Sequence, residues 1–474
     1  MWGSEVLMEE KKLGVRNVVS VSVGLVIATS CLVSLGQGAG NIGVVFIFAM
    51  IIACMLNMIS IASMSELNAL MPNTTGGLAQ YTLTSLGPVP TMVSMVGGYI
   101  LCNVLSAGVE ASIFSYAMGE ILHLPISNFW YTFLVTSVLL IANLKGVDMF
   151  AKIQDLVAYL LLGSMFFMGL IGALGMGTGV KVDQPYYMTT NPADIVPMIA
   201  VAFWLFIGAE YAIPISKDVK NAKRNVPLGM FIGLAIMCGV QSVMIFGFHN
   251  YTTWKELTES PAPHLLYGMN LLGTPGKLWM TLVAALAVVS TQNSSVQGLA
   301  NICQGMAKMN MMPQFFAKTN KNNVPYIGVW FASLLILFFG YISNDSSKLI
   351  SFLILVGSVF WMVSYIFAHI DVLVLRHRLP KAPRTFKVPF GPVLPLIGIA
   401  GTVDMIINIS TDPAERLMIW LVTGITFLIL FDYSVIWIKF KMKIPVFKSV
   451  PLEKVMAMEN EMYYIIRKRR KLCR

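Results

Sequence analysis

An acidic side chain lies in the middle of an apolar stretch, where membrane helices carry few charges. Glu110 falls within the run 88–120, with Ser106 four residues before it and Cys102 four residues earlier still. This spacing places all three candidate substrate-binding residues on one helix face. A carboxylate at the bilayer centre costs about 2.5–3.5 kcal/mol on insertion scales, so Glu110 is expected to face a cavity. It could attract a substrate cation or carry a proton. A neutral acid hydrogen-bonded to Ser106 or a neighbouring helix is the structural alternative.

Polar side chains interrupt another apolar run. Residues 290–295 (STQNSS) lie within the run 275–307, and their hydroxyl and amide groups could bind a substrate or ligate sodium. The structural alternative is that the Ser and Thr hydroxyls bond back to carbonyls of their own helix. The sequence leaves this choice open.

Patterns typical of catalysis or metal binding are not found in the sequence. The six cysteines form no CxxC pair, the five histidines are scattered, and HExxH, GxSxG and P-loop patterns do not occur. We therefore expect a protein that is not an enzyme and has no cofactor and no metal site.

The composition defines the class of protein. Of the 474 residues, 56% are hydrophobic and only 12% are charged, against about 25% charged in soluble domains. Mean hydropathy is +0.73. These values exclude soluble globular, disordered, collagen-like and coiled-coil proteins and indicate a polytopic protein of the lipid bilayer. The net charge of +10 comes from basic residues between apolar runs and in the tails. Membrane topology explains it, and no nucleic-acid partner is expected.

Twelve apolar runs are long enough to cross the hydrocarbon core, which needs about 20 residues. They are 17–40, 43–70, 88–120, 127–143, 149–176, 194–216, 226–249, 275–307, 325–343, 346–375, 392–410 and 414–438. The chain is accordingly divided into a cytoplasmic N-terminus (1–16), two five-helix repeats (17–176 and 194–375), helices eleven and twelve (392–438) and a basic cytoplasmic tail (439–474).

Basic residues are distributed unevenly between the two sides of the membrane. With the N-terminus placed inside, only five of the 33 fall in outer segments: Lys181, Lys255, Lys277, Lys348 and Arg416. The positive-inside rule then predicts a multi-pass protein of the cell membrane with both termini in the cytoplasm. The run 467–471 (RKRRK) is typical of a surface helix on anionic headgroups. A plug over the cytoplasmic mouth is the alternative.

Two of the apolar runs contain residues that resist a continuous helix. In the first, 28–31 (ATSC) precedes 34–40 (SLGQGAG), and in the sixth, 206–210 (FIGAE) precedes Pro214. Broken helices in lipid are tolerated only where the freed backbone faces a cavity or ligand. Breaks in spans one and six, five helices apart, indicate inverted repeats with a midplane binding site. A simple kink is the alternative for each.

Four segments, in order along the chain, resemble the amino acid–polyamine–organocation (APC) family of transporters, in particular its amino acid/polyamine exchangers. They are 65–72 (SELNALMP) followed by 76–81 (GGLAQY), 206–210 followed by 220–227 (KNAKRNVP), 306–325 with its MAK, FAKTNK and proline positions, and 383–389 (PRTFKVP). The similarity covers residues ~15–440.

The resemblance implies an all-α integral membrane fold with twelve transmembrane helices. Five helices and five inverted helices, with helices 1 and 6 broken, are followed by two C-terminal helices. The resemblance also implies that backbone groups at the break in span one (Thr29, Ser30, Cys31) receive a substrate carboxylate, and those in span six (Ile207, Gly208, Ala209) its amino group. The free N–H groups of a half-helix N-terminus suit an anion.

The resemblance further assigns substrate-tuning roles. Trp204 matches a tryptophan that acts as a lid over the substrate, with Phe203 as the neighbouring candidate and core packing as the alternative. Glu210 would couple the site to the inner gate or carry a proton, or only cap the break. Ser295 stands where arginine exchangers have a second aromatic residue, and Leu161 stands where some relatives have a lysine. The missing lysine slightly favours exchange over proton coupling.

The sequence departs from the family at the first break. Thr29-Ser30-Cys31 replaces the usual Gly-Ser-Gly, and losing both glycines narrows the approach to the backbone. We predict a secondary active transporter, a permease or antiporter, that moves amino acids or amine derivatives by alternating access. A proton- or sodium-coupled symporter and a non-transporting sensor remain alternatives. The sequence leaves the exact substrate and the oligomeric state open.

Overall fold

The structure is a computed structural model that describes residues 13–71, 78–145, 148–189, 191–213, 219–343 and 346–458. Predictions for other residues, including Pro214 and the basic run 467–471, lie outside this part of the chain. The described residues are almost entirely helical, with two isolated bridges, Leu13–Val219 and Gly43–Tyr187, as their only β-pairing.

The helices of the first half begin at the first predicted span. They are α1 (Val15–Val26), α2 (Thr29–Ile42), α3 (Phe46–Leu70), α4 (Leu78–Ser85), α5 (Pro88–Met95), α6 (Cys102–Leu122), α7 (Phe129–Lys145) and α8 (Asp148–Ala173). A π-helical turn, Val96–Leu101, joins α5 to α6 in one long span. Pro88 starts α5 at a position where its missing N–H leaves no bond unmade.

The second half begins with a helix that is interrupted after nine residues. Its helices are α9 (Ile195–Phe203), α10 (Ala222–Tyr251), α11 (Trp254–Glu259), α12 (Pro263–Leu272), α13 (Thr274–Lys308), α14 (Tyr326–Ile342), α15 (Ser347–Arg378), α16 (Val393–Ile407), α17 (Pro413–Ile436) and α18 (Leu452–Met458). Ser346 caps α15 by accepting a hydrogen bond from the Leu349 N–H.

The predicted spans correspond to apolar helices of different length. Among the described residues, seven helices are long and apolar enough to cross a membrane, or up to eight if α1 and α2 are counted as one bent span. Shorter apolar helices occupy four further predicted runs: Phe129–Lys145, Val157–Ala173, Tyr326–Ile342 and Val393–Ile407. Each of the twelve predicted runs therefore contains an apolar helix or a broken one.

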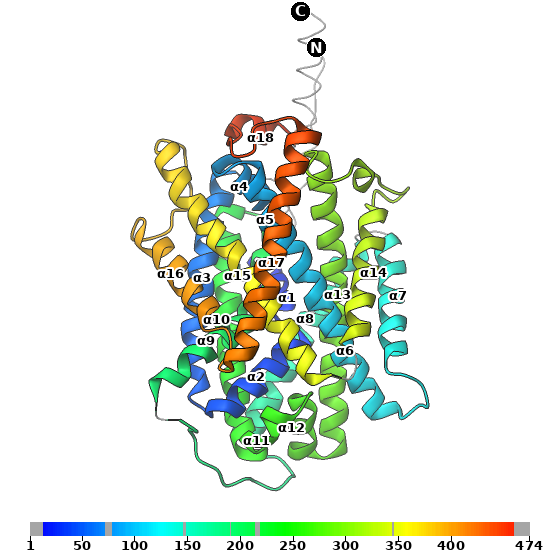
Figure 1. Cartoon of the computed structure of the whole chain (residues 1–474). Coiled ribbons are helices and arrows are strands. Elements are labelled where there is room, and N and C mark those ends of the chain that lie inside the picture. The colour runs from blue at the N-terminus through cyan, green and yellow to red at the C-terminus, as the bar shows by residue number, and fades with distance from the viewer. Residues whose placement is uncertain are drawn as a thin grey trace, which may run out of the picture.

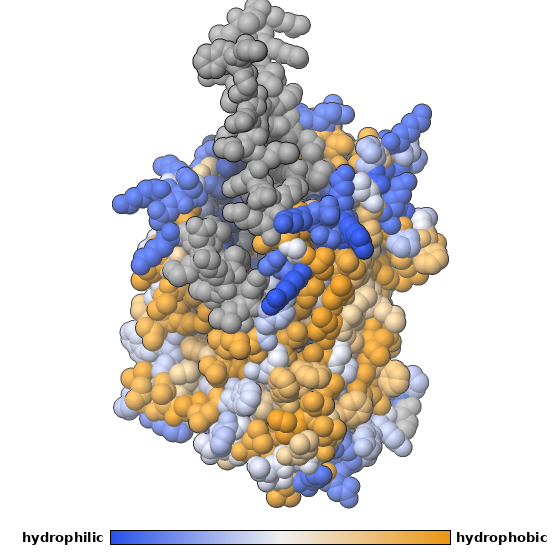
Figure 2. Space-filling view, turned by 180° about the vertical axis from the view of Figure 1, so that it is seen from behind, coloured by the Kyte–Doolittle hydropathy of each residue, from blue (hydrophilic) through white to orange (hydrophobic). Residues whose placement is uncertain are grey.

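The helices form one bundle whose sides are apolar. In Figure 1, α11 and α12 lie at one end, and α4 and α18 lie at the other. Figure 2 shows hydrophobic side chains over the middle of the visible face and hydrophilic side chains concentrated toward both ends. Helix α17 carries large exposed apolar side chains, including Leu417, Ile425 and Leu428. Such a continuous apolar surface fits lipid, and the chain is a multi-pass membrane protein.

The interior of the bundle is built around α1 and α6. Helix α1 packs against α8, α10 and α13, while α6 packs against α13, α14 and α15. These contacts bury both the first break and the middle of α6, including Glu110. The fold therefore brings the predicted break in span one next to the acidic residue of span three.

Candidate functional site

The first break creates a helix N-terminus inside the protein. The axis turns by 67° between Val15–Gly24 and Thr29–Ile42, and Ala28, the residue before α2, is extended. Its methyl side chain supplies no cap for the first N–H groups of α2, which need acceptors. The carboxylate of Glu110 in α6 supplies acceptors for the first two of these N–H groups. Its Oε2 accepts from Thr29 N at 2.6 Å, and its Oε1 accepts from Ser30 N at 2.7 Å. The Glu110 carboxylate thus occupies the N-terminus of α2.

The second break begins where α9 ends. A 3₁₀ turn over Trp204–Phe206 is followed by extended Ile207 and by Gly208 at φ +112°, a conformation that favours glycine. The Glu210 carboxylate accepts hydrogen bonds from Gly208 N at 3.2 Å, from Trp361 Nε1 at 2.7 Å and from the Tyr365 hydroxyl at 2.8 Å. Glu210 therefore fixes the break to α15.

Trp204 connects the two breaks. Its Nε1 donates to the Ser30 hydroxyl at 2.9 Å, and its backbone carbonyl lies 3.6 Å from the Cys31 sulfur. Its ring meets that of Trp361 edge to face, with centroids 6.5 Å apart. Tyr211 also packs edge to face on Trp361, at 6.1 Å. Three aromatic side chains thus meet between the broken helices.

A small cavity of about 30 Å³ lies between the two breaks. It is lined by Val26, Ala28, Cys31, Asn103, Ser106, Trp204, Ile207, Gly208, Tyr211, Thr291, Ser295 and Trp361. A space of this size holds a few water molecules and is too small for an amino acid. A substrate can enter only if the surrounding side chains or helices move apart.

The structure places most of the predicted substrate-binding residues at this cavity. Residues that line it are Cys31, Ser106, Trp204, Ile207, Gly208 and Ser295, and Ser30 bonds to Trp204 in its wall. Thr29 and Glu110 are not among the lining residues and bond to each other beside the first break. Three others face elsewhere. Cys102 donates to the Gly357 carbonyl of α15, Phe203 packs on Tyr365, and the Ala209 carbonyl accepts from Ser22. They support the walls of the site and do not line it.

The polar segment of α13 bonds mainly to other helices. Ser290 donates to the Gly24 carbonyl of α1, Gln292 donates to the Ala107 carbonyl of α6, and Asn293 accepts from Asn143 of α7. The Thr291 hydroxyl differs, because it is buried at the cavity and has no hydrogen-bond partner in the described structure. The segment thus ties four helices together and leaves one hydroxyl available to a ligand.

Sequence reasoning missed several residues of the site. Trp361 and Tyr365 come from α15, and Asn103 hydrogen-bonds Tyr211 across the cavity wall. In sequence, the two aromatic residues look like any large side chain in an apolar helix. They are four residues apart and therefore lie on one helix face. This spacing is the only sequence feature that could have suggested that both donate to the same acceptor, Glu210.

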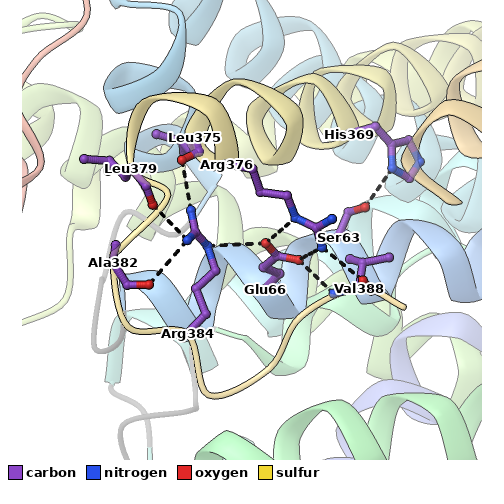
Figure 3. A network of polar contacts seen from close by, with 9 residues as sticks. All are labelled: Ser63, Glu66, His369, Leu375, Arg376, Leu379, Ala382, Arg384 and Val388. Atoms are coloured by element: carbon purple, nitrogen blue, oxygen red, sulfur yellow. Dashed lines mark hydrogen bonds and ion pairs between the residues drawn. The ribbon is translucent and has the colours of Figure 1, made fainter. Parts of the chain in front are cut away.

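A second region with a buried carboxylate lies near the end of α3. Glu66 bonds to Arg376 at 2.5 Å and to Arg384 at 3.3 Å, and it also accepts from Val388 N at 2.7 Å. Figure 3 shows the two guanidinium groups on either side of the Glu66 carboxylate. The Glu66 carboxylate is thus paired with two basic side chains near the end of its span. They join α3, α15 and the following loop.

Arg384 and a nearby histidine extend this network. The Arg384 guanidinium also donates to the carbonyls of Leu375 and Leu379, each at 2.9 Å (Figure 3). His369 contacts the hydroxyls of Ser60 and Ser63 at 3.2 Å and 2.8 Å. This end of the bundle is therefore held by charged and polar contacts between α3 and α15.

Fold and site define a multi-pass transporter in which two broken helices meet at an internal cavity. Residues 13–431 match the family model described as Amino acid permease, and the chain belongs to this APC family. Among solved structures, a manganese transporter from Eremococcus coleocola is similar at a TM-score of 0.62, with 13% identity, over 93% of this chain and 97% of that one. This likeness shows the fold.

Sequence relatives are transporters with different named substrates. The branched-chain amino acid permease BcaP of Bacillus subtilis (strain 168) is 22% identical over 90% of this chain and 93% of its own. The methylthioribose transporter of the same organism is 20% identical over 87% and 91%. The glutamate/gamma-aminobutyrate antiporter of Lactococcus lactis subsp. lactis (strain IL1403) is 24% identical over 52% of each chain.

Proposed function

We propose that this permease exchanges amino acids or their amine derivatives across the cell membrane by alternating access, with both termini in the cytoplasm. One observation carries the proposal. The broken spans meet at a single buried cavity, where Trp204 of the second break bonds to Ser30 of the first. A ligand in this cavity would contact both breaks, and its differential affinity would shift the balance between inward- and outward-open states.

Three side chains are proposed to couple the cavity to the gates. Trp204 acts as the lid, because breaking its bond to Ser30 separates the two breaks. Glu210 transmits movement of the second break to α15 through Trp361 and Tyr365. Glu110 transmits movement of the first break, at the start of α2, to α6.

Two further observations support amino acid or amine exchange. The printed names of relatives include a branched-chain amino acid permease and a glutamate/gamma-aminobutyrate antiporter. Leu161, at the position where some APC members have a lysine, is a fully buried apolar residue. No basic group there can carry a proton during transport.

Uptake by purified protein in liposomes tests this proposal. Labelled amino acids and amines would be offered to vesicles that are empty or loaded with unlabelled substrate, with and without proton or sodium gradients. Exchange predicts uptake only into loaded vesicles. Uptake into empty vesicles that follows an ion gradient would show a symporter instead, and binding without any uptake would show a sensor.

A further inference from the structure

We infer that the substrate is an organic amine without a carboxylate beside its amino group, because Glu110 already occupies the place of such a carboxylate. The inference rests on the proposed function and narrows its substrate class. Both oxygens of Glu110 are used by the N–H groups of Thr29 and Ser30, at 2.6 Å and 2.7 Å. These are the groups that a substrate carboxylate would need at this helix terminus.

A second carboxylate beside Glu110 would be strongly disfavoured. Like charges placed together in a buried site repel by several kcal/mol, and the described structure offers no cation there to offset this. The hydrogen-bond partners of Glu110 and Glu210 in the described residues are neutral: backbone N–H groups, the Thr29 and Ser30 side chains, an indole and a phenol. The site therefore holds two acidic groups that lack a counter-ion.

Side chains also close the approach to the backbone at the first break. Cys31 is buried, and its sulfur lies 3.1 Å from the Val26 carbonyl and 3.6 Å from the Trp204 carbonyl. The Thr29 hydroxyl donates to the Ala284 carbonyl of α13 at 3.2 Å, which holds this side chain beside the break. With both residues in place of glycine, a substrate carboxylate has little room beside the α2 N-terminus.

The cavity is suited to an ammonium group. Trp204, Tyr211 and Trp361 present aromatic rings to it, and such rings attract cations that lie against their faces. Thr291 lines the cavity, and its buried hydroxyl has no partner among the described residues, so it can accept a hydrogen bond from an ammonium N–H. An amine in this cavity would bring a positive charge between the two breaks to which Glu110 and Glu210 are bonded.

Pairs of compounds that differ only by the carboxylate test this inference in the wild-type protein. Putrescine is ornithine without its carboxylate, and 3-methylbutylamine is leucine without its carboxylate. Labelled putrescine and ornithine would be compared for uptake into liposomes loaded with the same compound. The leucine pair would be compared by thermal stabilisation of purified protein, because a neutral monoamine can also diffuse through lipid. We expect each amine to be favoured over its amino acid by about tenfold or more.

Two substitutions at Glu110 separate its charge from its occupancy of the helix terminus. Glu110→Gln keeps the size and one oxygen acceptor but removes the charge, so amine binding should weaken by about tenfold while the protein stays folded. Glu110→Ala frees the Thr29 and Ser30 N–H groups, so the amine-to-amino-acid preference should shift toward the amino acid. Glu259→Gln, in the exposed pair with Lys255, is the matched control and should behave as wild type.

The outcomes distinguish this inference from the proposed function. Wild-type protein that prefers the amine of each pair supports the inference. Uptake of ornithine or stabilisation by leucine that equals or exceeds the amine overturns the inference and leaves the proposed function standing. If none of the four compounds is transported or stabilises the protein but another labelled amino acid is exchanged, the inference fails and the proposed function stands. If no labelled amino acid or amine is exchanged, the proposed function fails and the inference fails with it.

Discussion

Two regions of this molecule contain buried carboxylates that differ in the charge of their hydrogen-bond partners. Near the ends of α3 and α15, Glu66 is neutralised by two arginines and a backbone N–H. At the centre, Glu110 and Glu210 bond only to neutral donors among the described residues. Burying a charge without a counter-ion is expensive, and proteins retain such groups mainly for function. The comparison indicates a structural ion-pair cluster of Glu66, Arg376 and Arg384, here called the clasp, at one end of the bundle. At the centre it is consistent with the proposed binding of a cation.

Removing the clasp should have the largest effect on stability. Glu66→Ala leaves Arg376 and Arg384 without their anion, and breaking a buried ion pair from one side costs about 3–5 kcal/mol. We expect a clearly lower melting temperature in detergent. The control Glu259→Gln removes an exposed pair and should leave melting unchanged. Equal melting of the two variants would show that the clasp is not structural.

Glu210→Ala should destabilise the protein by a comparable amount. It strands the Gly208 N–H and the polar hydrogens of Trp361 and Tyr365, at about 1–3 kcal/mol for each buried donor left without an acceptor. Glu210→Gln keeps one oxygen and should melt between this variant and wild type. If both variants melt like wild type, Glu210 does not fix the second break.

Single donors to Glu210 can be deleted by substitution with phenylalanine, which keeps the ring of Tyr365 but makes the side chain at position 361 smaller. Trp361→Phe and Tyr365→Phe each remove one hydrogen bond to the same carboxylate, and we expect each to destabilise the protein by about 1.5–3 kcal/mol. Thermal melting measures both. Only Trp361 lines the cavity, so only Trp361→Phe should also weaken amine binding. Equal weakening by both variants would contradict the assignment of Trp361 to the cavity wall.

Ser30→Ala should have the smallest effect of the series. It removes the acceptor of one buried donor, the Trp204 Nε1–H, but keeps the backbone bond from Ser30 N to Glu110, so a loss of about 1–3 kcal/mol is expected. Transport kinetics should show faster opening of the lid, seen as a changed exchange rate with little change in amine affinity. A loss of all transport would show that this hydroxyl binds substrate directly.

The fold was predictable because its signals are long and repetitive. Apolar runs indicated where helices lie, and the clusters around Thr29 and Gly208 indicated both breaks. The acidic residue in span three was predicted to face a cavity or a neighbouring helix. The structure shows it bonded to the neighbouring helix α2 and not among the residues that line the cavity.

The partners of these residues were not predictable, because they depend on packing between distant helices. Glu110 meets Thr29 and Ser30 across about 80 positions of sequence, and Glu210 meets Trp361 across 151. No local pattern records such a pairing. The family resemblance implied that this helix terminus receives a substrate carboxylate, whereas the structure shows Glu110 bonded to it.

A structure of the protein with bound putrescine would test the central claim most directly. The account predicts that Glu110 stays within hydrogen-bond distance of the Thr29 and Ser30 N–H groups and that one ammonium group lies among Trp204, Tyr211 and Trp361. The same measurement with ornithine provides the opposing case. An ornithine carboxylate bonded to Thr29 and Ser30, with Glu110 displaced, would contradict the account.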